Sequence, residues 1–272
     1  MTGGFEPGSV LVGRYRLIRQ ISEGGIGAVY EAEHMKIGKR VAVKVLRADL
    51  QDESRAVSRF IFEARSACMI EHDNVVNLID IDQTEDGVVF LVMEYLIGRD
   101  LAEAIRSEGR LAWPHAQQVA LQLCTALAAA HDRGIVHGDL KPANCFLVDT
   151  TEGEVVKVLD FGLAKVLGSR TPPASPRPPS LETMHELRWL KTGDGEVFGT
   201  LGYIAPEHLA GDPHDHRADI YSLGLVLYEM VTGTAPFGFS APEGFVREVL
   251  FRVPEAPSRR SEGSGSTPTR CR

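Results

Sequence analysis

Residues 14–96 contain short apolar runs that are separated by glycines and charged residues. The runs are rich in Val, Ile, Leu and Tyr, a composition and spacing typical of strands in an antiparallel sheet. Residues 53–70 differ, because their apolar positions recur at spacings of three and four, which predicts a helix. We therefore expect a sheet with one helix set against it. The expected strands have the sequences YRLIRQI, GAVYEAEH, RVAVKVL, VVNLIDI and VVFLVMEYL.

The pattern changes after Gly98. Segments rich in Ala and Leu follow at residues 100–106, 114–132 and 220–232, and their period of about 3.6 residues indicates helices. Strands followed by helices predict an α+β fold, here with two lobes: an antiparallel sheet plus one helix, and a mainly helical part. The expected organisation is an N-terminal extension (1–13), an N-lobe (14–96), a C-lobe (97–251) and a tail (252–272).

Two segments are expected to lie outside regular structure. Residues 171–179 hold five of the 15 prolines, so they form neither helix nor ladder and predict an extended loop, within an insertion at about residues 168–195. Residues 252–272 contain five Arg, two Glu and almost no apolar anchors. Such a composition does not offset the entropy of ordering the chain, so a disordered basic tail is expected.

Length and composition exclude several classes of protein. The 272 residues fit one large domain or two lobes, and 43% hydrophobic with 24% charged residues match an ordinary globular chain. The formal net charge of −8 argues against a broad duplex-binding face, because such faces are built from excess Lys and Arg. No nucleic acid partner is expected.

The cysteines and the apolar segments indicate a compartment. Cys68, Cys124, Cys145 and Cys271 form no CxxC pair, so they predict neither a zinc cage nor a disulfide framework, and we expect reduced thiols in the cytoplasm. The N-terminal MTGGFEPG lacks the basic start and apolar run of a signal peptide. The longest apolar-rich segment, 119–130, is shorter than the roughly 20 residues that span a bilayer, so no membrane segment is expected.

A first candidate for chemistry lies between two predicted strands, in the sequence SEGGIGAVY. Its glycines, Gly24, Gly25 and Gly27, would let backbone amides approach a phosphate chain without interference from a Cβ atom. A dinucleotide-binding glycine loop opens a helix, whereas here Val29 and Tyr30 follow, which favours a hairpin. An ordinary glycine-containing turn is the alternative interpretation.

A second candidate is Lys44 in the strand sequence VAVK. Alternation places Lys44 on one strand face with Ala42, where the ammonium would neutralise phosphate oxygens and the small Ala42 would leave room for a flat ring. Glu63, on the predicted helix, supplies a carboxylate to hold Lys44. A solvated strand lysine and an unrelated surface glutamate are the alternatives.

A third candidate is the segment HGDLKPAN, followed by a short hairpin and the sequence DFG. It places Asp139, Lys141 and Asn144 within one loop and a second carboxylate, Asp160, after the hairpin. Phosphoryl transfer to a hydroxyl needs one acid that orients the nucleophile and another that binds a metal ion. A polar turn without chemistry is the alternative.

Together, these residues resemble the motif set of the protein kinase family. The sequences GRYRLI and YSLGLVLYEMVTG resemble its bacterial, eukaryotic-like serine/threonine members most, and the resemblance runs from about residue 13 to about residue 253. It implies the two-lobed kinase fold and transfer of the ATP γ-phosphate to Ser or Thr of proteins, including autophosphorylation. Lys141 and Thr200 favour Ser/Thr over Tyr as the acceptor.

The resemblance also assigns roles to individual positions. The implied nucleotide contacts are Ser22, Gly24, Gly25, Gly27 and Val29 of the glycine-rich loop, Ala42 and Lys44, Met93 at the gatekeeper position, Glu94 and Leu96 of the hinge, Asp100 at the ribose, and Phe146 below adenine. The implied catalytic groups are Asp139 as base, Lys141 at the γ-phosphate, and Lys44 with its partner Glu63, while Asn144 and Asp160 hold Mg²⁺ or alternatively Mn²⁺. Asp219 resembles the buried aspartate that braces the catalytic loop, and Ala205, Pro206 and Glu207 the end of the activation segment.

Three positions depart from the family pattern. Ser22 replaces the opening glycine of the loop, which predicts a modest loss of loop freedom. Gly138 stands where many kinases have Arg, so activity is not expected to depend strongly on an ion pair to a phosphorylated activation segment. The C-lobe appears truncated after residue 253, which predicts that Glu207 is a buried carboxylate without its arginine partner.

These departures leave two alternatives beside an active protein kinase. A nucleotide-binding pseudokinase or scaffold would follow from the missing C-terminal helices and from Ser22. A small-molecule phosphotransferase would follow from the His-Gly-Asp and Asn144 pattern, although such enzymes do not need the segment ending at Glu207. The expected ligands and partners are ATP, Mg²⁺ and a protein substrate with a Ser or Thr acceptor.

Overall fold

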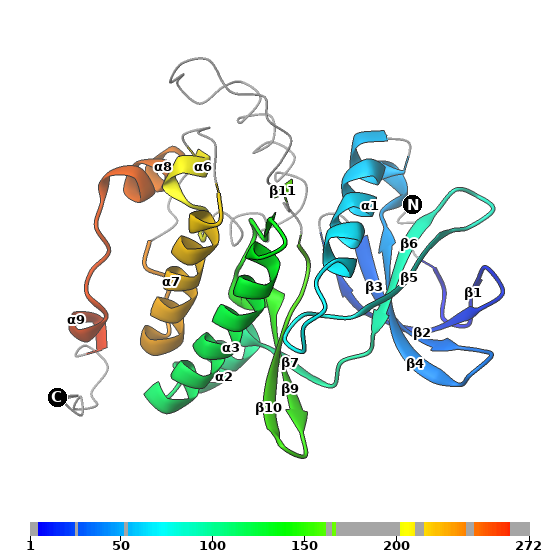
Figure 1. Ribbon diagram of the computed structural model, residues 1–272, viewed down its shortest axis with the longest axis horizontal. Helices are drawn as coiled ribbons and strands as arrows, with labels where there is room; N and C mark the ends of the chain where they lie inside the picture. The colour runs from blue at the N-terminus through cyan, green and yellow to red at the C-terminus, as the bar shows by residue number, and fades with distance from the viewer. Residues whose placement is uncertain are drawn as a thin grey trace.

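The computed structural model describes residues 5–24, 27–51, 54–161, 165–166, 202–209, 215–237 and 242–261, apart from the side chains of residues 49, 54, 55, 59, 63, 165, 166, 242–246 and 261. Figure 1 shows two lobes: a sheet with α1 against it on one side, and the helices α2, α3 and α7 on the other. The expected two-lobed α+β arrangement is confirmed.

The N-lobe is a six-stranded antiparallel sheet with strand order β1-β2-β3-β4-β6-β5. One face packs a core that contains Leu17, Val43 and Phe90. The other face packs against α1, through residues such as Phe60, because the apolar stripe of the helix faces the sheet. The elements are β1 (Val10–Leu11), β2 (Tyr15–Glu23), β3 (Gly27–His34), β4 (Lys39–Leu46), η1 (Ala48–Leu50), α1 (Ser54–Cys68), β5 (Leu78–Gln83) and β6 (Val89–Glu94).

Two segments differ from the sequence pattern in this lobe. Residues 5–13, assigned to an extension, contribute strand β1 and the buried Leu11 to the sheet. The strand expected at VVNLIDI begins only at Leu78, because Val76 donates its N–H to the carbonyl of Val158 at 3.0 Å and Val158 donates to Asn74 at 2.8 Å. The loop before β5 therefore pairs with the C-lobe instead of with the N-lobe sheet.

Helices α3 and α7 pack against each other in the C-lobe, where Leu123, Leu127, Val226 and Met230 share one buried core. A three-stranded sheet, β10-β9-β7, and the β11-β8 pair carry the loops that face the N-lobe. The elements are β7 (Gly98–Asp100), α2 (Leu101–Glu108), α3 (Trp113–His131), β8 (Ile135–Val136), η2 (Pro142–Asn144), β9 (Cys145–Thr150), β10 (Gly153–Val158), β11 (Lys165–Val166), α6 (Pro206–Leu209) and α7 (Arg217–Thr232).

The chain beyond α7 forms two more helices, α8 (Pro242–Phe251) and α9 (Pro257–Ser261). The second lies within the expected disordered tail, and Arg260 explains its position. Its guanidinium donates to the carbonyl of Ala235 at 2.7 Å and lies over the ring of Tyr228 at 5.8 Å. One arginine thus provides the anchor that apolar residues do not. The insertion at about 168–195 and residues 262–272 lie outside the described residues.

Within the described part of the chain, no helix has the length and apolar character needed to cross a membrane. The three described cysteines are free thiols: Cys68 and Cys124 are exposed and Cys145 is buried.

Candidate active site

A buried carboxylate on α7 holds the loop between β8 and η2. Asp219 is fully buried, and its two oxygens accept the backbone N–H groups of His137 and Gly138, each at 2.8 Å. His131, at the end of α3, contacts the same carboxylate at 2.7 Å. Gly138 has a φ of 75°, a conformation that glycine adopts without strain. This geometry supports the bracing role expected for Asp219.

Asp139, Lys141 and Asn144 converge within this loop. The Lys141 ammonium donates to Asp139 Oδ2 at 2.9 Å, and Asn144 Nδ2 donates to the Asp139 carbonyl at 2.8 Å and to Oδ2 at 3.1 Å. The backbone N–H of Asp139 donates to His137 Nδ1 at 3.2 Å. Among the described residues both side-chain donors therefore use Oδ2, which leaves Oδ1 able to accept a proton from an incoming hydroxyl.

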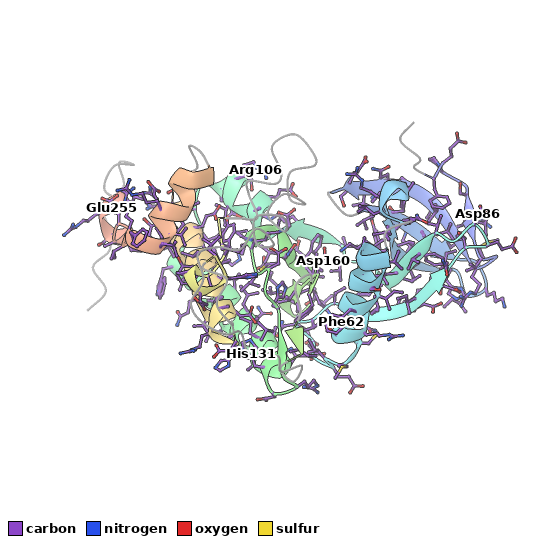
Figure 2. All side chains as sticks on the ribbon, turned by 90° about the horizontal axis from the view of Figure 1, so that it is seen from above. Phe62, Asp86, Arg106, His131, Asp160 and Glu255 are labelled. Carbon is purple, nitrogen blue, oxygen red and sulfur yellow. The ribbon has the colours of Figure 1, made fainter. Side chains whose placement is uncertain are left out.

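Lys44 and Asp160 join the two lobes. The Lys44 ammonium, on β4, donates to Asp160 Oδ1 at 2.7 Å, and the lysine side chain is 6% exposed while the aspartate is 40% exposed. Figure 2 shows Asp160 between the lobes. Asp160 has a φ of 46°, a left-handed conformation that Asp tolerates better than most residues. The backbone therefore turns its carboxylate toward the N-lobe lysine.

The charges around Asp160 keep it ionised. Burial raises the pKa of this carboxyl, but the positive charge and hydrogen bond of Lys44, with Lys141 and His137, lower it more, so the net pKa lies below its usual range. Phe161 is buried and its ring lies 4.7 Å from the ring of His137. The segment after β10 is thus packed onto the catalytic loop.

The donor set fits a magnesium ion. Asn144 directs its NH₂ group to Asp139, which leaves Oδ1 of the amide as an acceptor, and Asp160 uses one oxygen for Lys44 and keeps the other. Mg²⁺ is usually held by one or two side-chain oxygens together with phosphates and water. Among the described residues no cluster of three or more His, Cys, Asp or Glu forms a denser metal site.

The glycines of the loop between β2 and β3 have different surroundings, and only some of these surroundings require glycine. A Cβ atom on Gly27 would lie 2.2 Å from the carbonyl oxygen of Val45, so glycine is required there by the close approach of β3 and β4. Gly24 donates its N–H to the carbonyl of Gly27 at 2.8 Å, and a Cβ atom on Gly24 would make only an ordinary contact, with the Gly27 carbonyl oxygen at 3.9 Å. Ser22 pairs with Val29 across the hairpin, which confirms the predicted hairpin. Gly25 lies outside the described residues.

The residues expected to contact adenine lie on one face of the N-lobe sheet and on β9. Ala42 is paired with Met93 on β6, and Lys44 with Val29 on β3, so these four share the face that carries Lys44. Phe146, on β9, is partly buried in the other lobe. These positions agree with a flat ring between Ala42 and Phe146.

The segment that links the lobes contains Glu94, Tyr95 and Leu96. Glu94 Oε1 accepts from Lys157 Nζ and from the Asn77 backbone N–H, each at 2.8 Å, so its side chain bridges β6 to β10. The Leu96 side chain is partly buried. The linking segment is therefore held from the C-lobe side as well as by its own strand.

Asp100 has a second role that the sequence pattern did not indicate. Its carboxylate caps α2 by accepting the Glu103 backbone N–H at 2.7 Å, which satisfies one of the free donors at the helix start. The predicted ribose contact of Asp100 would have to share that carboxylate.

Two expectations concern the partners of charged residues: Glu63 as the partner of Lys44, and the burial of Glu207 without an arginine. The Glu63 backbone lies in α1, but its side chain lies outside the described residues, and the ion-pair partner described for Lys44 is Asp160. Glu207 is partly exposed instead of buried, since it lies on the first turn of the short helix α6. The full burial expected for this residue is therefore not found. Gly199 and Thr200 lie outside the described residues.

Sequence analysis missed several residues around the site. Ile21 is 44% exposed on β2 directly before the glycine loop, and the only signal in the sequence was its apolar residue type beside that loop. Glu31 is a buried carboxylate that contacts Arg19, Arg40 and Tyr95. No local pattern indicated this cluster, because its members come from separate segments.

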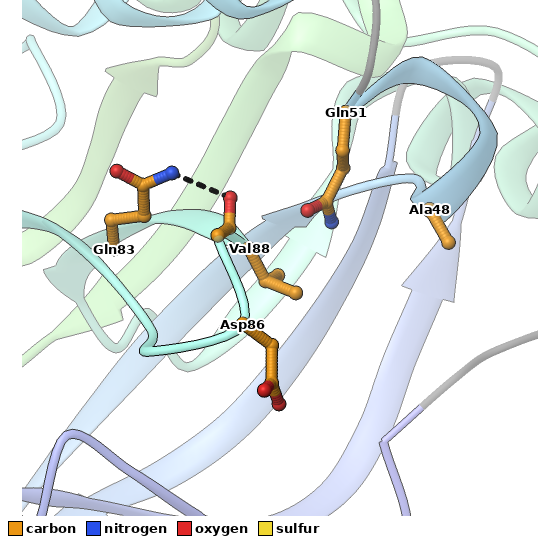
Figure 3. A pocket seen from close by; sticks show the side chains of 6 residues that line it. Ala48, Gln51, Gln83, Asp86 and Val88 are labelled. Carbon is orange, nitrogen blue, oxygen red and sulfur yellow. Dashed lines mark hydrogen bonds between the residues drawn. The ribbon is translucent and has the colours of Figure 1, made fainter.

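A pocket of about 410 Å³ lies elsewhere in the N-lobe, between η1 and the β5–β6 turn (Figure 3). On the β5–β6 side of the pocket, Gln83 donates to the Gly87 carbonyl at 2.7 Å. None of the predicted site residues lines it. The lining residues are Ala48, Gln51, Gln83, Asp86, Gly87 and Val88.

Comparison with known proteins identifies similar chains. The family model for the protein kinase domain matches residues 15–261. The chain is 36% identical over 262 residues to serine/threonine-protein kinase pkn3 of Myxococcus xanthus, covering 96% of this chain and 45% of the relative. It is 41% identical over 253 residues to serine/threonine-protein kinase Pkn1 of the same organism, covering 92% and 33%.

A mycobacterial relative shows the same extent of similarity. Serine/threonine-protein kinase PknA of Mycobacterium tuberculosis is 36% identical over 254 residues, covering 92% of this chain and 53% of the relative. The chain thus spans between about a third and a half of the length of these three relatives. The family match ends at residue 261, beyond the C-lobe boundary expected at residue 251.

Proposed function

Because the chain belongs to the protein kinase family, we propose that it transfers the γ-phosphate of ATP to serine or threonine hydroxyls of proteins, itself included. The observation that carries this proposal is the convergence of Asp139, Lys141 and Asn144 in one loop with the Lys44–Asp160 pair beside it. The relatives that carry the name serine/threonine-protein kinase support the choice of acceptor.

The residues divide the chemistry between them. Asp139 accepts the hydroxyl proton through Oδ1, while its other oxygen stays bonded to Lys141 and Asn144. Lys44 and Lys141 offset the phosphate charge from opposite sides, and Asn144 and Asp160 would hold Mg²⁺ or Mn²⁺. When bound, the metal ion neutralises negative charge on the ATP phosphates. Most of the acceleration comes from positioning and electrostatics.

The braced loop explains how Asp139 stays in place. Asp219 holds the two residues that precede Asp139 through their backbone N–H groups, so a buried carboxylate fixes the backbone that leads to the base. Each charged group named above has a partner of opposite charge or a hydrogen bond. The assembled set supports a catalyst over the scaffold and small-molecule alternatives.

The reaction is tested with purified protein, γ-labelled ATP, Mg²⁺ and a basic protein acceptor. We expect label on Ser and Thr but not Tyr, and loss of about 10²- to 10⁴-fold in rate for Asp139→Asn, the range for removing a general base. A parallel reaction with Mn²⁺ tests the alternative metal. Incorporation no higher than in the Asp139→Asn variant would contradict the proposal, and label on a sugar hydroxyl alone would favour the small-molecule alternative.

We also propose that the reaction takes place in the cytoplasm, where ATP, Mg²⁺ and reduced thiols occur together. The free thiols of Cys68, Cys124 and Cys145 support this. The net charge of −8 supports protein partners over nucleic acid.

A further inference from the structure

A buried carboxylate on β3 lies outside the catalytic machinery described above. The Glu31 side chain is 4% exposed and has three charged or polar partners. Oε2 forms an ion pair with Arg19 Nε at 2.8 Å and accepts from the Tyr95 hydroxyl at 3.1 Å, and Oε1 forms an ion pair with Arg40 Nε at 3.2 Å. The carboxylate is therefore compensated by two guanidinium groups and a hydroxyl.

The position of Glu31 relates this cluster to the proposed adenine site. Glu31 is directly paired with Ala42 across β3 and β4, and Ala42 is paired with Met93 across β4 and β6. Residues opposite each other in an antiparallel ladder share a sheet face. Glu31 therefore lies on the same face as the small residue that leaves room for a flat ring.

Tyr95 is the member of the cluster that does not belong to a strand of the sheet. It lies two residues after Met93, in the segment between β6 and β7 that links the lobes. Its hydroxyl contacts Glu31 and accepts from Arg19 at 3.2 Å, and its ring lies under the Arg40 guanidinium at 5.6 Å. The linking segment is thereby tied back to β2, β3 and β4.

The energetics favour Glu31 as the centre of this arrangement. Arg19 and Arg40 are 58% and 62% exposed, so water solvates them whether or not Glu31 is present. Glu31 is shielded from water, and a buried carboxylate that loses a partner is costly. Because an uncompensated Glu31 would be costly, Glu31 keeps its hydrogen bond with the Tyr95 hydroxyl. Glu31 therefore holds Tyr95 in place.

We propose that Glu31 is a positioning residue for the adenine of ATP, an inference that rests on the proposed kinase function. By holding Tyr95, Glu31 fixes the linking segment beside Ala42, at the edge of the proposed site for the ring between Ala42 and Phe146. It touches neither the phosphates nor the reacting atoms. Its loss should weaken nucleotide binding and leave the transfer step almost unchanged.

Two substitutions test this link with little change in shape. Tyr95→Phe removes only the hydroxyl, and Glu31→Gln removes the charge but keeps an acceptor. Each has a matched control on the same strand as Glu31. Tyr30→Phe removes a hydroxyl that accepts from the Phe5 backbone N–H on the opposite sheet face, and Glu33→Gln removes a more exposed carboxylate paired with Arg16 at 3.5 Å.

The measurements are the Kd values of adenosine and of Mg·ATP, with KM for ATP and kcat. We expect Tyr95→Phe and Glu31→Gln each to raise both Kd values and KM by about three- to tenfold, the range for one hydrogen bond, with kcat within about twofold. The double variant should lose less than the product of the two single effects, because both substitutions break one contact. The two controls should bind like the wild type.

The outcomes separate this inference from the proposed function. Wild-type protein that binds neither adenosine nor Mg·ATP would overturn both. Wild-type binding with unchanged Kd values in Tyr95→Phe would overturn the inference alone, and this conservative variant decides the question if Glu31→Gln fails to fold. A loss confined to Mg·ATP, with adenosine unaffected, would place the effect at the phosphates and would also overturn it.

Discussion

Lys44 of the N-lobe sheet donates its ammonium to Oδ1 of Asp160, which follows the last strand of the C-lobe hairpin, at 2.7 Å. The lysine is almost fully buried, while the aspartate keeps part of its surface in solvent. One ion pair therefore joins the two lobes at the proposed phosphate site and fixes the position of a proposed metal ligand. If Lys44 is substituted, the aspartate left behind is partly exposed to solvent. The substitution is therefore expected to affect phosphoryl transfer without unfolding the protein.

Lys44→Ala is expected to abolish phosphoryl transfer while the fold persists. The phosphates lose a compensating charge and Asp160 loses its partner, but water reaches the remaining carboxylate. We expect a loss of at least about 10²-fold in kcat/KM, measured with labelled ATP, and a melting temperature within a few degrees of the wild type. The exposed Lys39 on the same strand supplies the control, since Lys39→Ala should leave both values unchanged. Equal turnover in Lys44→Ala would refute the assignment.

Asp219→Asn is expected to destabilise the protein and to slow transfer. The amide offers one acceptor oxygen to the N–H groups of His137 and Gly138, and its NH₂ group repels the other donor. Breaking a buried charged interaction of this kind costs about 3–5 kcal/mol in the free energy of unfolding, measurable by urea denaturation. Asp215→Asn, at a more exposed position two residues before the same helix, should change it by less than about 0.5 kcal/mol. Equal stabilities of the two variants would contradict the bracing role.

The stability that Asp219 contributes depends on pH. Burial raises the pKa of Asp219, but the hydrogen bond from His131, the charge of His137 and the backbone N–H groups of His137 and Gly138 lower it more, so it lies below its ordinary value. A carboxyl with a lowered folded-state pKa stabilises the fold above its unfolded value of about 3.9 and loses this effect as the pH falls through the folded value.

The comparison of wild type with Asp219→Asn isolates this contribution. We expect the difference in unfolding free energy to be constant from about pH 7 to about pH 5 and to shrink below about pH 4, where the unfolded chain binds the extra proton. Urea midpoints at each pH measure it. A difference that grows toward acid pH would show that the sign of the pKa shift is wrong.

Gly27 and Gly24 are expected to respond differently to alanine, although they belong to one loop. The new Cβ at Gly27 would meet the Val45 carbonyl oxygen at 2.2 Å, so strands β3 and β4 would have to move apart. We expect Gly27→Ala to lower the free energy of unfolding by about 1–3 kcal/mol. A Cβ atom on Gly24 would make only an ordinary contact at 3.9 Å, which predicts unchanged stability for Gly24→Ala. Chemical denaturation of both variants tests this, and equal losses would contradict it.

The sequence was enough to locate those site residues that lie close together along the chain. Asp139, Lys141 and Asn144 occupy one loop, so their order in the sequence was enough to predict that they converge. The strands and the main helices followed from the period of their apolar positions. Asp100 shows the limit of such reasoning, because its residue type fitted two roles and only the position of Glu103 revealed the helix cap.

The local sequence pattern did not predict contacts between segments that are far apart along the chain. The ion pair of Lys44 with Asp160 joins residues 116 positions apart in the chain, so no local pattern indicated it. The expected pairing of Lys44 with Glu63 stays a prediction, because the Glu63 side chain lies outside the described residues. Nothing near Glu31 in the chain indicates its contacts with Arg19, Arg40 and Tyr95. The helix α9 was missed because a single arginine, and not an apolar stripe, anchors it.

The sequence by itself determined the two-lobed class, the kinase family resemblance and the identity of the proposed catalytic groups, because periodicity and short motifs are local properties of a chain. Only the tertiary structure decided which oxygens are occupied, that the Asp219 carboxylate braces the catalytic loop, and how the linking segment is tied to the sheet. The physical reason is that burial and pairing of a charge depend on every element that packs around it, and those elements come from distant parts of the chain.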